Sequence, residues 1–199
     1  MSNKFVDKAL EGMGAVEKLI SGLPGIREYR DKELRRDADY RVRQMIASGL
    51  EEQKQRLYDL QKQLLKSGGL SWVDDVDGAV TKLQTLADKI KTASYGYAGL
   101  FNAQKIQEAQ LSALHRFDVA LMARTEEVKA AIAGLEAAIS GRDGINDAID
   151  ALTDKLTELN NLFSQRASAV EDPDLLTDTA GPELDEDLLA AAFPAEEEK

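Results

Sequence analysis

Carboxylates are abundant in the sequence, but none is spaced as a catalytic pair, and imidazole and thiol side chains are scarce. Its only histidine is His115, and it has no cysteine. Di-iron helical proteins need paired Glu-x-x-His motifs, but the residue three before His115 is Ser112. A lone histidine beside Leu114 and Phe117 is more typical of a side chain at the edge of a core than of a metal ligand. We therefore expect no metal and no cofactor.

Other catalytic signatures are missing as well. The chain has no P-loop, and Gly12-Met13-Gly14 lacks the third glycine and the strand context of a dinucleotide-binding turn. No Ser-His-Asp arrangement is recognisable around the single histidine. Without cysteine, thiolate zinc sites and a cysteine nucleophile are excluded. The sequence predicts that the protein is not an enzyme.

The composition favours long helices. The 199 residues are 43% apolar and 31% charged but only 6% aromatic, which points away from a β-sandwich. No apolar run approaches the 18 residues that suggest a membrane-spanning helix, and the N-terminus lacks the apolar segment of a signal peptide. We expect a soluble, cytoplasmic protein.

Heptad spacing is clearest in the second half of the chain. It predicts helices over about 103–139 and 144–170. The later helix has one seam, interrupted only by the polar Arg166: Ile145, Ile149, Leu152, Leu156, Leu159, Phe163 and Val170. The earlier helix repeats by sevens and has a companion row: Leu114, Leu121, Val128 and Leu135, with Phe117, Ala131 and Ala138. Between them, Gly141 suits a helix C-terminus and Asp143 an N-cap, so the two helices should be antiparallel.

A second hairpin is predicted upstream, with helices over about 26–66 and 72–97. The apolar positions that end the first helix are Leu50, Leu57, Leu60, Leu64 and Leu65. That helix stops at Gly68-Gly69, and a kink at Ser48-Gly49 would shorten its straight length. Ser71 is the expected N-cap of the next helix, whose buried stripe should be Val73, Val76, Val80, Leu83, Leu86, Ile90 and Tyr97. Together the segments predict an all-α fold over 23–170: an elongated antiparallel helical bundle, or paired coiled-coil hairpins.

Most of the net charge belongs to the C-terminal tail. Residues 171–199 hold eleven acids and one base, −10 of the total −11. Such a composition predicts a disordered acidic tail. Leu184, Leu188, Ala192 and Phe193 fall on one face of a short helix, and Leu189 completes an acid-Leu-Leu element that begins at Asp187. Such an acidic-hydrophobic segment could fold into a partner's groove. A merely solubilising tail is the alternative.

Residues 1–22 predict a short amphipathic helix ended by Gly22. It packs either on the bundle or on a membrane surface. Membrane-surface helices usually carry a Lys/Arg-rich polar face, whereas Lys4, Lys8 and Lys18 are offset here by three acids. The spacing therefore favours packing on the bundle without excluding the membrane.

The basic cluster from Arg27 to Arg43 is interleaved with acids. Four acid–base pairs have the favourable i,i+4 order: Glu28–Lys32, Asp31–Arg35, Asp37–Arg41 and Asp39–Arg43. A phosphate-binding stripe needs an unneutralised positive face. We expect a solvated, self-paired helix face and no nucleic-acid partner.

The run 93–102 places Tyr95, Tyr97 and Phe101 around two glycines. It forms either the elbow between the two hairpins or an exposed aromatic docking patch. Together with Pro24–Arg36 and His115–Leu121, this run resembles a group of uncharacterised all-helical bacterial proteins over roughly residues 20–140. The resemblance implies a helical fold and transfers no activity.

These features favour a non-enzymatic helical scaffold or adaptor. It would act through helix–helix contacts, including self-association, and through the acidic-hydrophobic C-terminal arm. The expected partner-binding residues are those of the arm and of the aromatic run. The alternative is a peripheral membrane-associated scaffold that uses the first helix, in the manner of phage-shock-type helical scaffolds.

Overall fold

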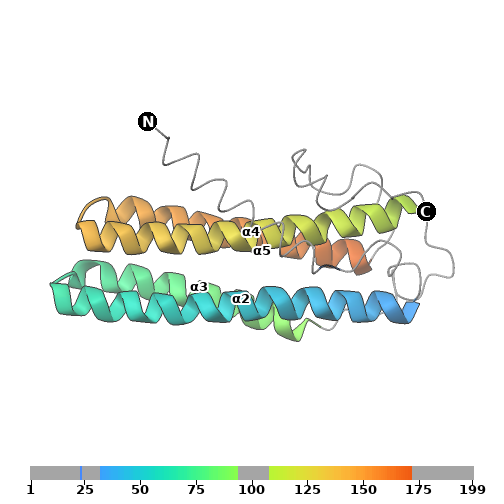
Figure 1. Ribbon diagram of the computed structural model, residues 1–199, viewed down its shortest axis with the longest axis horizontal. Helices are drawn as coiled ribbons and strands as arrows, with labels where there is room; N and C mark the ends of the chain where they lie inside the picture. Colours follow the sequence, from blue (N-terminus) through green and yellow to red (C-terminus); the bar gives the residue numbers. More distant parts are fainter. Residues whose placement is uncertain (1–22, 24–31, 94–107, 172–199) are drawn as a thin grey trace, which may run out of the picture. The chain divides into compact units, whose positions relative to one another are not determined.

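The computed structural model describes residue 23, residues 32–93 and residues 108–171. Nearly all of these residues are helical and none is in a strand, so the predicted all-α class is confirmed for this part of the chain. The elements shown in Figure 1 are α2 (Lys32–Ser67), the 3₁₀ turn η2 (Leu70–Trp72), α3 (Val73–Thr92), α4 (Glu108–Gly141) and α5 (Ile145–Glu171). The predicted N-terminal helix (1–22) and residues 172–199 of the predicted tail lie outside the described residues.

The chain divides into two compact units. Among the described helical residues, unit 1 holds residues 32–42, 108–126 and 165–171, and unit 2 holds residues 43–93 and 127–164. Helices α2, α4 and α5 each contribute residues to both units, whereas α3 belongs to unit 2 alone.

The predicted apolar seams form the buried faces of the helices. Within the described side chains, every seam position of α5 is buried, from Ile145 to Phe163, and Arg166 is buried in line with them. The sevenfold row of α4 is buried too, but its companion row differs from the prediction. Ile132 and Ile139 are buried, while Ala131 and Ala138 are only half-buried. The larger side chains occupy the core because they remove more apolar surface from water.

The first hairpin follows the prediction at most apolar positions. Leu50, Leu57, Leu60 and Leu64 are buried, but Leu65 is 52% exposed because it lies one position beyond the buried stripe of α2. Val73, predicted as the first buried position of the next helix, is only half-buried. The helix is continuous through Ser48-Gly49. Helix α3 ends at Thr92 rather than at 97, since Ala93 leaves the helical conformation with ψ 105°.

The helix ends differ from the predicted caps. Ser71 lies inside η2 and does not cap α3, whose N-cap position is Trp72. Asp143 does not cap α5 either, because the first hydrogen bond of that helix runs from Ala148 N to Gly144 O at 3.0 Å. Helix α4 ends in a Schellman motif in which Arg142, not a glycine, has positive φ (57°). Its two bonds are Asp143 N to Ala138 O and Arg142 N to Ile139 O.

Polar side chains connect the four helices of unit 2 in a ring. Lys54 and Gln61 of α2 donate to Gln84 and Asp77 of α3, respectively. The partner residue falls by seven as the α2 residue rises by seven, so α2 and α3 are antiparallel. Trp72 donates to Asn146 and Lys89 to Asn160. Here both residue numbers rise together, so α3 and α5 are parallel.

The ring is closed by two ion pairs. Arg56 of α2 lies 2.9 Å from Glu136 of α4, and Lys155 of α5 lies 3.0 Å from Glu127 of α4. The order around unit 2 is therefore α2, α3, α5, α4. Two pairs of helices, α2 with α4 and α3 with α5, form opposite sides of this unit.

Candidate functional site

The residues predicted to bind a partner lie outside the described part of the chain. They are Tyr95, Tyr97, Phe101, Leu184, Leu188, Leu189 and Phe193. The functional features of the described residues are a buried charge cluster in unit 1 and two charged grooves in unit 2. Sequence reasoning pointed to one member of the cluster, Arg166, and to neither groove.

The buried charge cluster joins three helices within unit 1. The Arg166 guanidinium of α5 donates from Nη1 to Oδ1 of Asp39 on α2 at 2.7 Å, and from Nε to Oδ1 of Asp118 on α4. The three residues are only 1%, 1% and 0% exposed, respectively. A planar guanidinium can donate to two carboxylates at once because its N–H groups form a rigid fork.

Burial determines what this cluster can do. An isolated charge in a protein interior costs several kcal/mol, so each of these groups depends on its partners. Because the cluster is closed to solvent, its charged groups contact one another and not a ligand in solution. His115 is buried on the same helix as Asp118, and the Thr125 hydroxyl on that helix is satisfied by the Leu121 carbonyl at 2.8 Å.

The cluster corrects the prediction of a fully solvated Arg27–Arg43 face. Asp37 and Arg41 are exposed as expected, but Asp39 and Arg43 are buried. Asp39 forms an ion pair with Arg166 of α5, a different helix. The i,i+4 rule could not show this, because it considers only neighbours on the same helix.

One sequence signal for the cluster was present on α4. Residues 111–122 are apolar except for Ser112, His115, Arg116 and Asp118. A helix that is apolar on nearly all sides is typical of a buried position, and a carboxylate within it needs a basic partner. The polar interruption at Arg166 supplied the matching base.

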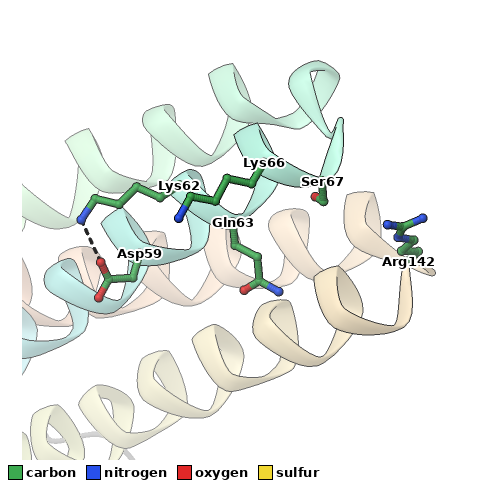
Figure 2. A pocket seen from close by; sticks show the side chains of 6 residues that line it. All are labelled: Asp59, Lys62, Gln63, Lys66, Ser67 and Arg142. Atoms are coloured by element: carbon green, nitrogen blue, oxygen red, sulfur yellow. Dashed lines mark hydrogen bonds and ion pairs between the residues drawn. The ribbon is translucent and has the colours of Figure 1, made fainter.

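The first charged groove lies on the α2–α4 side of unit 2 and has a volume of about 570 Å³. We call it the basic groove; it is lined by Asp59, Lys62, Gln63, Lys66, Ser67 and Arg142. All six side chains are exposed, and three bases face one acid. Figure 2 shows Lys62 and Lys66 extending from α2, with Arg142 contributed by the end of α4. Lys62 pairs with Asp59 at 2.9 Å.

The second groove lies on the α3–α5 side of unit 2, with a volume of about 500 Å³. We call it the acidic groove. Its exposed rim carries Asp74, Asp75 and Asp150 against one base, Lys82. Its buried lining is apolar and comes from Ala79 and Ile149. Gly78 widens it, since a Cβ there would meet nothing within 4 Å.

Two other kinds of functional feature, a membrane-spanning helix and a metal-binding cluster, are absent from the described residues. None of their helices is both long and apolar enough to cross a bilayer. Within the same residues, no three His, Asp or Glu side chains are grouped so as to hold a metal ion.

Comparisons of the sequence and of the fold with known proteins give no family. No family model, no curated protein and no solved structure matches the chain. The resemblance to all-helical bacterial proteins therefore stays a prediction.

Proposed function

We propose that this chain is a non-enzymatic helical scaffold or adaptor that binds other proteins through its helix faces and its acidic C-terminal arm. In this proposal two antiparallel hairpins, α2–α3 and α4–α5, pair to form a helical bundle. The observation that supports it most directly is the ring of polar contacts in unit 2. The ring holds four helices in defined registers and leaves charged grooves on two sides.

The buried charge cluster supports the same proposal. Buried polar and ionic groups can specify register in helical assemblies, at some expense of stability. Arg166 bonds to carboxylates on two other helices, so it selects one alignment of α5 against α2 and α4. A scaffold needs such a defined surface, since its partners recognise a fixed arrangement of side chains.

The C-terminal arm gives the proposal its direct test. We expect full-length protein immobilised on beads to capture at least one protein from the native cell. Leu188→Asp with Phe193→Asp should abolish that capture by placing charge on the apolar side of the arm. The matched control, Thr177→Asp with Thr179→Asp, adds equal charge away from those residues and should retain it.

Purified partner then decides between the proposals. A complex that forms with the wild type and the control variant, but not with the Leu188/Phe193 variant, supports the adaptor. Equal binding by all three overturns the role of the arm. Co-sedimentation of the protein with liposomes, lost on removal of residues 1–22, would instead favour the membrane-associated scaffold.

A further inference from the structure

We infer that unit 2 is a self-assembly module in which the basic groove of one copy binds the acidic groove of a second copy. This inference rests on the proposed scaffold function and names a partner for it. It comes from the two grooves together, because one carries mostly bases and the other mostly acids.

The charges of the two grooves are complementary. The basic groove has three bases and one acid, and the acidic groove has three acids and one base. The charged side chains are exposed in both, so they are accessible to a second molecule. Opposed potentials of this kind guide encounter and fix the register of an interface.

Apolar surface accompanies the charges in the acidic groove. In the acidic groove, Ala79 and Ile149 provide an apolar floor behind the aspartates. The methylene chains of Lys62 and Lys66 would thus meet an apolar floor rimmed by carboxylates. This combination of an apolar centre and a charged rim is usual for protein interfaces.

The position of the grooves determines the kind of assembly. The basic groove lies on the α2–α4 side and the acidic groove on the opposite α3–α5 side of unit 2. A contact between two different surfaces is heterologous, so every copy bound through one groove still presents the other. Such contacts form rings if their rotation closes and open chains if it does not.

Charge reversal tests the contact in full-length protein. We expect the sedimentation coefficient of the wild type to rise with concentration and to rise less in high salt, which screens exposed charges. Lys62→Glu with Lys66→Glu should abolish the rise, and so should Asp75→Lys with Asp150→Lys. A chain that carries all four charge reversals again has two oppositely charged grooves. Its sedimentation coefficient should therefore again rise with concentration.

Matched controls separate the contact from a general charge effect. Lys91→Glu with Lys129→Glu, and Glu52→Lys with Asp88→Lys, make the same charge changes at exposed positions outside the grooves. Both control variants should associate like the wild type. Far-ultraviolet circular dichroism during heating checks that each variant is folded. A groove variant that unfolds at a lower temperature than the wild type is replaced by a neutral variant of the same groove. The neutral variants are Lys62→Gln with Lys66→Gln, and Asp75→Asn with Asp150→Asn.

Mixing the neutral variants tests the heterologous geometry. Each neutral variant keeps one working groove, so alone it should remain a monomer, and a one-to-one mixture should stop at a dimer. Overturning results are a wild type that stays monomeric at all concentrations, a four-reversal chain that fails to associate, or neutral variants that each form dimers alone. Partner capture by the C-terminal arm is measured separately, so its persistence would show that only this inference has failed.

Discussion

Arg166 on α5 and Asp39 on α2 lie 127 residues apart in the chain and form an ion pair of 2.7 Å that is almost closed to solvent. The same guanidinium also pairs with Asp118 on α4. Three helices of unit 1 thus meet at one basic side chain, in a position that the heptad pattern assigns to an apolar residue. The ion pairs of Arg166 replace apolar packing at this position with contacts that form in only one alignment of the helices.

We predict that Arg166→Ala strongly destabilises the protein. The substitution leaves two buried carboxylates without their shared guanidinium, and breaking a buried ion pair from one side costs about 3–5 kcal/mol. Urea unfolding followed by circular dichroism measures this loss in the free energy of unfolding.

The companion variant carries Asp39→Leu, Asp118→Leu and Arg166→Met together. Because it removes every buried charge of the cluster at once, its stability should equal or exceed that of the wild type. A triple variant as unstable as Arg166→Ala would contradict this prediction. It would show that the ion pairs stabilise unit 1 more than apolar side chains do at the same positions.

The helices themselves were predictable from the sequence, because apolar periodicity acts within one element. Leu152, Leu159 and Phe163 needed no knowledge of the other helices to be placed on a buried face. The pairing of Arg166 with Asp39 and Asp118 was not predictable, since several acids were available and spacing along one helix says nothing about another.

Helix ends and surface grooves were harder for a different reason. The N-cap at Gly144 and the left-handed conformation of Arg142 depend on how the chain turns between α4 and α5. The residues of this turn are compatible with more than one choice of N-cap and of left-handed residue. Asp143 is a residue type preferred at an N-cap and Gly141 one preferred at a helix C-terminus. In the structure the N-cap is Gly144, and the residue with positive φ is Arg142. The acidic groove combines α3 and α5, so its aspartates become neighbours only once the parallel register of those helices is known.

The second prediction is that Arg142→Gly stabilises the protein. Arg142 has φ 57°, which costs an L-residue about 1–2 kcal/mol, and glycine adopts this conformation without that strain. Part of the gain is lost because glycine has more freedom in the unfolded chain. We expect a net rise of about 0.5–1 kcal/mol in the free energy of unfolding, measured in urea.

Gly144→Ala is the opposite test at the same connection. Gly144 also has positive φ (64°), so alanine there should lower stability by about 1 kcal/mol. If Arg142→Gly lowers stability instead, contacts of the arginine side chain outweigh its backbone strain.

The third prediction concerns the close packing at Gly69, between α2 and η2. A Cβ at this buried position would lie 2.7 Å from Leu64 Cδ2 and 3.1 Å from the Trp72 ring. Leu64 is itself buried and has little room to move. Gly69→Ala should therefore cost about 1–3 kcal/mol, as overpacking does.

Trp72 makes this change directly observable, since it is the only tryptophan in the chain. Fluorescence-detected urea unfolding should show the loss of stability. Gly134→Ala is the matched control: it lies within α4, a Cβ there meets nothing within 4 Å, and alanine is the better helix former by about 1 kcal/mol. Equal effects of the two substitutions would contradict the packing argument.

The last prediction concerns alkaline pH. Hydrogen bonds from Lys155 to Glu158 at 2.9 Å and to Glu127 at 3.0 Å raise the pKa of its ammonium group above the ordinary 10.5. The charged lysine therefore contributes stability that is complete below its unfolded-state pKa and is lost as the pH rises through the higher folded-state value. Because the side chain is 34% exposed, solvent screening limits this contribution to less than about 1 kcal/mol.

Urea midpoints of the wild type and of Lys155→Met should therefore differ at pH 9 and converge as the pH rises past 10.5 and through the raised pKa of Lys155. Lys91→Met provides the control, since Lys91 is an exposed lysine at the end of α3. Subtracting the variant from the wild type removes the alkaline titration of other groups that the two proteins share. A difference that stays constant across this range would mean that Lys155 acts through the packing of its methylene chain and not through its charge.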